Sequence, residues 1–284
     1  MTPRVVETAR GPVEVAESGS GPAVLLVHGS PGDWTQAVAL ARDLSSTHRV
    51  LLPSRPGYGA TPLRTGRTPR EQADAYAALL DALGIERAAV VGISGGGPSS
   101  RALAAHHRDR VTHLALLCAV AEHLITVPRG MRALAGVPLL WDAFATLASR
   151  RAQAALRDPA AVVAQSVAEL GPSEREQVDA DVEADLLEFA GSRARALRSV
   201  TGLRNDLRAF HTARQPADWP AGPGVPALVL HGDADTVVPL AHGEHHRDTL
   251  PGARLEVLPG VGHAFPLSLR RQTARRLLDH LEAS

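Results

Sequence analysis

The sequence predicts an α/β protein with a mostly parallel, doubly wound sheet and an inserted all-helical cap. Short apolar runs alternate with helix-length stretches over residues 5–121, and this alternation resumes after residue 220. Such a pattern is typical of a parallel sheet with helices on both faces. Between the two regions the strand-like runs vanish, and alanine, leucine, arginine and glutamate dominate. We therefore predict a core of residues 1–121 and 219–284, with residues 122–218 forming the cap.

Each predicted strand is a short run rich in aliphatic residues and bounded by turn-forming residues. In chain order, these runs are residues 5–8, 13–17, 23–27, 50–52, 88–91, 111–117, 227–231 and 253–258. The first two flank Gly11 and Pro12, which indicates a leading antiparallel pair. The third run is apolar throughout, as expected of a strand that is buried on both faces.

Helices are indicated by apolar residues that recur every three or four positions and by residues suited to capping. Asp33 is placed to cap a helix over residues 37–44. Thr68 and Pro69 are suited to begin a helix that ends near residue 83. The remaining core helices are predicted over residues 96–107, 240–250 and, as an amphipathic closing helix, 267–281.

Composition and charge argue against several kinds of partner. The 30 basic and 30 acidic residues leave no net charge, so neither nucleic acid nor an anionic membrane is an expected partner. The one cysteine, Cys118, lies in an apolar run, residues 114–121, that is too short to span a bilayer. We expect a buried, inert thiol. The lone cysteine and an N-terminus without an apolar signal region favour a cytoplasmic location.

The segment Gly92–Gly96 places a serine, Ser94, between a predicted strand and a predicted helix. A sharp turn from strand to helix forces the residue at its apex into a strained backbone and exposes its side chain. Neighbours two positions away must lack bulk, and here both are glycine. The segment therefore predicts a nucleophilic serine at the edge of the sheet.

A serine nucleophile needs a base, usually a histidine that a carboxylate orients. His263 lies in a glycine-rich loop, Gly260 to Pro266, after the last predicted strand. Asp233 and Asp235 lie in the loop after the preceding strand. Because the carboxyl ends of parallel strands meet at one edge, we expect these groups to converge on Ser94. Spacing alone does not separate Asp233 from Asp235.

A second histidine cluster, His242, His245 and His246, has helical spacing that would suit a metal ion. No carboxylate-rich motif accompanies it, so we interpret these histidines as a solvated helix surface. We expect neither a metal nor an organic cofactor, because serine, histidine and aspartate together supply nucleophile, base and orienting acid.

Taken together, Gly92–Gly96, the His28-Gly29 loop, the loop from His231 to Asp235, and Gly262-His263 resemble the α/β-hydrolase family. The resemblance covers residues 5–121 and 220–282. It implies the α/β-hydrolase fold, with the helical insertion as a cap over the active edge.

The resemblance also implies a role for each matching residue. Ser94 would be the nucleophile, His263 the base and Asp235 the acid, with Asp233 as the weaker choice. The backbone amides of Ser30 and Gly95 would form the oxyanion hole.

The implied activity is hydrolysis of a carboxylic ester, or a related acyl bond, of a small and largely apolar substrate. Relatives that open epoxides or remove halide carry aspartate where this chain has Ser94, so these activities are disfavoured. Perhydrolase or haloperoxidase-like chemistry, carbon–carbon bond hydrolysis and proline iminopeptidase-like activity stay open. A hydrolase-fold protein that only binds a small ligand is the non-enzymatic alternative.

Substrate specificity is expected to reside in the cap. Large apolar side chains within residues 122–218 are the candidates for the pocket wall, and Met131, Trp141 and Phe144 are the residues assigned to substrate binding. Three others are weaker candidates: Leu134, Phe189 and Phe210. For any one of them, packing of the cap onto the core is the simpler role.

Overall fold

The computed structural model describes residues 1–121, 128–197, 200–212 and 224–283. Its core is an eight-stranded sheet in the order β1-β2-β4-β3-β5-β6-β7-β8. The strands are β1 Arg4–Thr8, β2 Gly11–Ser18, β3 Ala23–Val27, β4 Arg49–Pro53, β5 Ala88–Ile93, β6 Val111–Leu117, β7 Ala227–Gly232 and β8 Arg254–Leu258. β2 pairs antiparallel with β1 and with β4, and all other pairs are parallel. The predicted fold class is confirmed.

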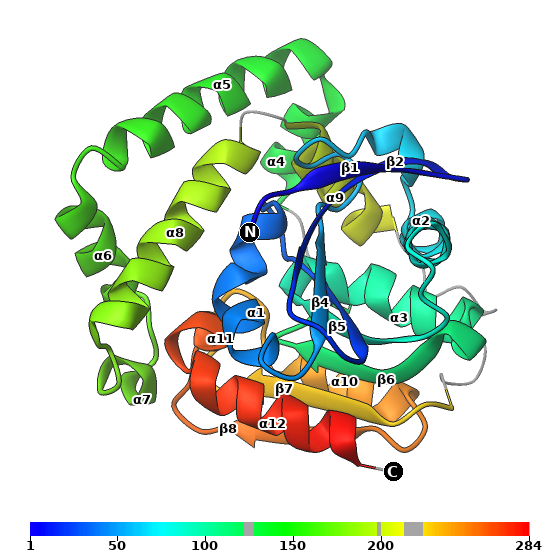
Figure 1. The fold of residues 1–284 in the computed structure, drawn as a ribbon. Coiled ribbons are helices and arrows are strands. Elements are labelled where there is room, and N and C mark those ends of the chain that lie inside the picture. The colour runs from blue at the N-terminus through cyan, green and yellow to red at the C-terminus, as the bar shows by residue number, and fades with distance from the viewer. Residues whose placement is uncertain (122–127, 198–199, 213–223, 284) are drawn as a thin grey trace.

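Helices cover both faces of this sheet (Figure 1). On one face, α2 (Pro69–Ala82) and α3 (Gly97–His106) pack on a cluster that includes Val90 of β5. On the other, α1 (Val38–Leu44) and α12 (Arg270–Glu282) pack on a cluster that includes Val91 of the same strand. Because successive side chains of a strand point to opposite faces, the central strands are apolar throughout. α10 (Ala241–Thr249) lies beside β7 and β8.

Local sequence signals explain where several core helices begin. The Thr68 hydroxyl accepts from the Glu71 amide at 3.2 Å, and the Glu71 carboxylate accepts from the Thr68 amide at 3.1 Å. This capping box starts α2 at Pro69, as predicted. Asp33 caps a short 3₁₀ turn, Trp34–Ala37, that leads into α1.

The closing helix departs from the prediction. In place of one helix over residues 267–281, α11 (Phe265–Ser268) and α12 are separated at Leu269. Leu269 leaves the helical region with φ −114° and ψ 31°, and its carbonyl accepts from the Thr273 amide to begin the next helix. The apolar pattern of residues 267–281 continues across the break, so the sequence gives no sign that the helix is interrupted there.

Helices are the only regular elements among the described residues between β6 and β7, and Figure 1 shows them beside and above the core. They are α4 Arg129–Gly136, α5 Pro138–Ala155, α6 Pro159–Ala168, α7 Pro172–Arg175, α8 Ala180–Ala196 and α9 Val200–Thr212. Proline opens α5, α6 and α7, where its missing N–H and fixed φ are tolerated. The predicted cap boundaries at residues 122 and 218 lie outside the described residues. Within the described ranges, no helix is both long and apolar enough to cross a membrane.

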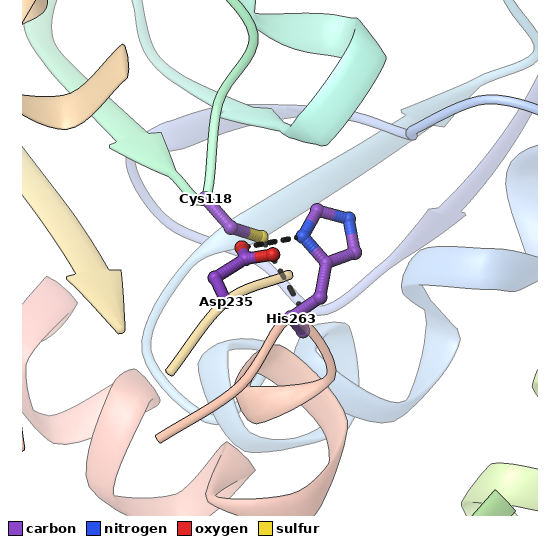
Figure 2. A group of neighbouring side chains, drawn as sticks. All are labelled: Cys118, Asp235 and His263. Atoms are coloured by element: carbon purple, nitrogen blue, oxygen red, sulfur yellow. Dashed lines mark hydrogen bonds and ion pairs between the residues drawn. The ribbon is translucent and has the colours of Figure 1, made fainter. Parts of the chain in front are cut away.

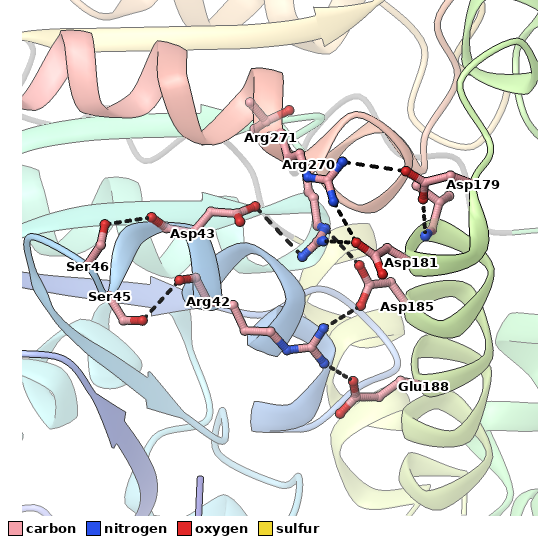
Figure 3. A network of polar contacts seen from close by, with 12 residues as sticks. Arg42, Asp43, Ser45, Ser46, Asp179, Asp181, Asp185, Glu188, Arg270 and Arg271 are labelled. Atoms are coloured by element: carbon pink, nitrogen blue, oxygen red, sulfur yellow. Dashed lines mark hydrogen bonds and ion pairs between the residues drawn. The ribbon is translucent and has the colours of Figure 1, made fainter.

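Ion pairs fasten the cap helix α8 to the core helices α1 and α12 (Figure 3). Asp185 of α8 lies 2.8 Å from Arg42 and 2.9 Å from Arg270, and its side chain is only 1% exposed. Arg42 also reaches Glu188 at 2.8 Å. One buried carboxylate thus joins two core helices to one cap helix, which fixes how α8 lies over the core.

We predict that Asp185→Asn destabilises the protein by about 2–3 kcal/mol, because it removes the buried negative charge that Arg42 and the largely buried Arg270 share. The measurement is the free energy of unfolding in urea. Asp181→Asn is the control: its carboxylate also meets arginines, Arg271 and, at 3.5 Å, Arg270, but it is 60% exposed, and exposed ion pairs contribute little. Equal losses in the two variants would contradict the assignment of Asp185 as the buried link.

Candidate active site

Ser94 occupies the turn between β5 and α3, with a positive φ of 49°. A Cβ atom added to Gly92 would lie 2.7 Å from the Ser100 hydroxyl oxygen, and one added to Gly96 would lie 2.5 Å from the Val27 carbonyl oxygen. Both positions therefore require glycine for close packing rather than for φ. The carbonyl of Ser94 accepts from the Val120 amide at 3.0 Å, which holds the turn against the loop after β6.

The structure brings His263 and Asp235 to Ser94. His263 Nε2 lies 3.1 Å from Ser94 Oγ, and its Nδ1 lies 2.6 Å from Asp235 Oδ2. The other carboxylate oxygen accepts from the amides of Val237 and Val238 at 2.9 and 2.8 Å. The three side chains follow β5, β7 and β8, where parallel strands end at a common edge.

Asp233 takes a different position. Its Oδ1 accepts from the Gly260 amide at 2.7 Å, so it joins the two loops that carry Asp235 and His263. The geometry therefore separates two carboxylates that spacing could not, and it is Asp235 that contacts the imidazole.

Burial and charge together set the protonation of this pair. Burial by itself raises the pKa of Asp235, but the hydrogen bond and charge of His263 and the two loop amides bring it below the usual range. Burial by itself lowers the pKa of His263, whereas contact with Cys118 and Asp235 brings it above 6.5. Since burial also raises the pKa of the Cys118 thiol, the thiol is neutral, and we attribute the increase to the Asp235 carboxylate.

Cys118 is the active-site neighbour that sequence reasoning missed. It is buried, as predicted, but its Sγ donates to the His263 carbonyl at 3.5 Å, beside Asp235 (Figure 2). Its φ is +40°, and Ser94 is the other non-glycine residue with positive φ in the described ranges. The sequence feature that could have identified Cys118 is its position directly after β6, at the same sheet edge as Ser94.

Metal-ligating atoms gather at one place in the described residues. Atoms of Cys118, Asp235 and His263 lie within 4.8 Å of one another, so these residues could hold a soft cation. The Asp235–His263 hydrogen bond already uses two of those atoms. His242, His245 and His246, the cluster whose spacing would suit a metal ion, form no such group in the part of the chain that is described. The interpretation of this cluster as a solvated helix surface is wrong for two of its members, because His242 and His246 are 4% and 1% exposed. His242 accepts from the Ala121 amide at 2.9 Å.

The loop after β3 lies directly against the serine turn. A Cβ atom added to Gly95 would lie 3.2 Å from the Ser30 amide nitrogen, and one added to Gly29 would lie 3.0 Å from Ser94 Cβ. Ser30 and Gly95 thus lie directly against each other beside Ser94.

His28 and Gln36 hold that loop in place. His28 Nδ1 lies 2.7 Å from the Gly29 carbonyl, and its Nε2 accepts from the Arg55 amide at 2.9 Å. Burial, with the nearby charge of Arg55, lowers the pKa of His28 to about 3. The imidazole is therefore neutral and shapes the loop. Gln36 accepts from the Gly29 amide at 2.6 Å.

A buried carboxylate from the cap supports the loop that carries His263. Glu174 of α7 accepts from the amides of Gly262 and Gly171 at 2.6 and 2.7 Å, and from the Ser268 hydroxyl at 2.6 Å. With every one of these donors satisfied by one carboxylate, the loop before His263 has a defined conformation. The sequence signal for Glu174 was its position three residues after Gly171, at the start of a helix.

A cavity of about 340 Å³ opens from Ser94 and His263 toward the cap. Its wall combines core and cap residues and is largely apolar, as in Leu40, Leu186 and Phe189. The full lining is Gly29, Ser30, Gln36, Ala37, Leu40, Ile93, Ser94, Ser166, Glu169, Leu170, Leu186, Phe189, Ala190, Arg193, Ala234, Thr236, Val237, Gly262, His263, Ala264, Pro266 and Leu267.

The three cap residues assigned to substrate binding are not in this lining. Trp141 is fully buried and contacts Phe144, with ring centroids 5.7 Å apart. Phe144 is 39% exposed, and Met131 is half-buried. Phe189, one of the weaker candidates, does line the cavity. The helices α5 and α8 carry similar large apolar side chains, and the sequence does not show which of them face the cavity. It therefore could not rank the candidate pocket residues.

Comparisons with known proteins agree with this arrangement. A family profile described as "alpha/beta hydrolase fold" matches residues 22–268. The chain is 31% identical over 273 residues, 93% of this chain and 96% of the relative, to a pimeloyl-[acyl-carrier protein] methyl ester esterase of Chromobacterium violaceum. It is 27% identical over 277 residues, 93% and 89% of the two chains, to a 2-hydroxymuconate semialdehyde hydrolase of Pseudomonas putida. An alpha/beta hydrolase fold protein from Nakamurella multipartita superimposes with a TM-score of 0.79 at 33% identity, covering 99% of this chain and 100% of that one.

We predict a pH dependence that follows His263. A base must be neutral to accept a proton, so kcat/KM for an ester should rise with pH through the pKa of His263, above 6.5. Asp235→Asn removes the carboxylate that raises this pKa, and should shift the rise to lower pH. It should also lower the rate by about 10³–10⁴-fold, because the amide favours the wrong imidazole tautomer.

The control for that pH profile is Asp233→Asn, which alters the carboxylate that bonds the Gly260 amide instead. Its profile should superimpose on that of the wild type. A shift with Asp233→Asn and none with Asp235→Asn would contradict the assignment of the acid.

Proposed function

Because the chain belongs to the α/β hydrolase fold family, we propose that it is a carboxylic ester hydrolase that forms an acyl-enzyme on Ser94. The observation that carries the proposal is the continuous contact from Ser94 Oγ through the His263 imidazole to Asp235, at 3.1 and 2.6 Å. An esterase is also among its relatives, at 31% identity over nearly the whole of both chains.

In the proposed reaction, Ser94 Oγ attacks the ester carbonyl carbon while His263 Nε2 takes the hydroxyl proton. The imidazolium then gives this proton to the leaving alcohol, and an ester of Ser94 remains. Water repeats the sequence with His263 as base and releases the acid. Asp235 stabilises the imidazolium and keeps Nδ1 protonated, so that Nε2 faces the serine.

Negative charge that develops on the carbonyl oxygen is proposed to be stabilised by the amides of Ser30 and Gly95. Their loops are held by buried hydrogen bonds, so these donors need little reorganisation during the reaction. Ser94 itself stays in its strained turn throughout, with its hydroxyl open to the cavity.

The cavity supports a preference for an apolar acyl group of medium length. At a share of roughly 30 Å³ per non-hydrogen atom, taken from liquid water, its volume corresponds to on the order of ten atoms. The wall is largely apolar, and its charged residues Glu169 and Arg193 are exposed. Arg193 stands over the Phe189 ring, 5.9 Å from its centroid. We therefore propose acyl chains of about six to eight carbons.

The test is hydrolysis of p-nitrophenyl esters with acyl chains from acetyl to dodecanoyl. We predict that kcat/KM peaks at about six to eight carbons, because longer chains exceed the cavity volume. No turnover of any ester by the folded protein would contradict the proposal and favour the ligand-binding alternative. Turnover only of 1,3-diketones would favour carbon–carbon bond hydrolysis.

A matched pair of variants ties the chain-length preference to this cavity. Ala190→Phe places a ring inside the cavity wall on α8, and should lower kcat/KM for the octanoyl ester at least about tenfold with little effect on acetyl. Ala184→Phe introduces the same ring on an exposed turn of the same helix, and should change neither. An unchanged profile in Ala190→Phe would place the acyl group elsewhere.

A further inference from the structure

The Ser30 side chain takes part in a buried hydrogen-bond network that joins the core to the cap. Its hydroxyl donates to Asp206 Oδ2 and accepts from Arg55 Nη1 at 2.7 Å. Ser30 follows β3 in the core, whereas Asp206 belongs to the cap helix α9. The residue whose amide is proposed to bind the oxyanion is therefore attached to the cap through its own side chain.

Asp206 is a fully engaged buried carboxylate. Arg55 donates to it from both terminal guanidinium nitrogens, from Nη2 to Oδ1 at 2.7 Å and from Nη1 to Oδ2 at 3.0 Å, and the two side chains are 2% and 3% exposed. The Tyr58 hydroxyl donates to Oδ2 at 2.7 Å. Burial raises the pKa of Tyr58 well above its usual range, so the phenol keeps this proton. A forked arginine and two hydroxyls give the carboxylate a single defined position.

Backbone contacts fix α9 at the same place. The Gly202 amide donates to the Gly57 carbonyl at 3.1 Å. A Cβ atom added to Gly202 would lie 2.5 Å from the Tyr58 ring, so this helix approaches the core as closely as its backbone allows. Asp206 lies one helical turn further along and reaches the network from a rigid base.

We propose that Asp206 is a positioning residue, which holds the Ser30 amide in the oxyanion hole through the Ser30 hydroxyl. The inference rests on the proposed ester hydrolysis. It makes the docked cap a part of the catalytic apparatus, in addition to its role as a wall of the substrate cavity. Loss of the link should raise the barrier to the tetrahedral intermediate, while substrate binding in the apolar cavity is unaffected.

The most direct test is Ser30→Ala, which keeps the backbone N–H and the Arg55–Asp206–Tyr58 contacts but removes the tie. Complete loss of one oxyanion donor costs about 10²–10³-fold in kcat, so a loosened donor should cost about tenfold, with KM within twofold. Affinity for a trifluoromethyl ketone with a hexyl chain, which forms an oxyanion on Ser94, should fall by the same factor.

Ser192→Ala is the matched control for a lost hydroxyl–carboxylate bond between cap and core. The Ser192 hydroxyl of α8 is buried and donates to Asp33 at 2.8 Å. This variant should be destabilised to a similar degree, while kcat stays within threefold of wild type. Equal losses of kcat in the two variants would show that the effect is general destabilisation and would overturn the inference.

Asp206→Asn separates positioning from a direct role of the hydroxyl. If Asp206 positions the loop, this variant lowers kcat, and adding Ser30→Ala to it costs less than threefold more. If the hydroxyl itself contacted the oxyanion, Asp206→Asn would release it and kcat would not fall, which would contradict the inference. Should Asp206→Asn not fold, an unchanged kcat in Ser30→Ala, or an equal loss of kcat in Ser192→Ala, would still overturn the inference.

The outcomes for the inference and for the proposed function are distinct. Wild-type turnover with an unchanged Ser30→Ala variant would overturn the inference and leave the esterase proposal standing. Absence of wild-type turnover would overturn both.

Discussion

The strained turn at Ser94 is the constraint on which the rest of the site depends. A non-glycine residue at φ 49° costs about 1–2 kcal/mol, so its surroundings must enforce it. β5 lies in the middle of the sheet, buried along its whole length, and delivers the chain to this turn in one direction only. Glycine at 92 and 96 lets α3 and the loop after β3 approach closely enough to hold it. The same close approach puts Ser30 directly against Gly95.

Three carboxylates of the cap hold further parts of the core in place. Asp206 reaches Ser30 and Arg55, Glu174 reaches the Gly262 amide beside His263, and Asp185 bridges α1 and α12. Buried ion pairs add little net stability compared with apolar packing, but they penalise every arrangement that leaves a charge unpaired. We interpret them as a device that specifies one position of the cap. The loops that carry the nucleophile's partners are then held from both core and cap.

The sequence sufficed for the core because its signals are local. Each strand is a short apolar run, and loops after parallel strands share one edge, so Ser94, Asp235 and His263 could be predicted to converge before any coordinates were known. Spacing alone could not choose between Asp233 and Asp235, because the choice depends on which loop amides each carboxylate meets; the family resemblance favoured Asp235. The break at Leu269 was missed because apolar periodicity continues through it.

The contacts between the cap and the core could not be predicted from the sequence, for a different reason. Asp206 and Ser30 are separated by 176 positions along the chain, and nothing in the helical pattern of residues 200–212 distinguishes a buried aspartate from a solvated one. Trp141 and Phe144 have the size and polarity of pocket residues, yet packing within the cap places them away from the described cavity. Cys118 follows a strand that carries no other chemical motif.

The most direct test of an activated serine is covalent labelling with a fluorophosphonate, followed by intact mass and peptide mapping. We predict one adduct on the wild type, located on Ser94 and absent from Ser94→Ala. Its rate should fall in His263→Ala, where the hydroxyl loses its base. An unlabelled but folded wild type, or an adduct that persists in Ser94→Ala, would contradict the assignment of Ser94 as the nucleophile.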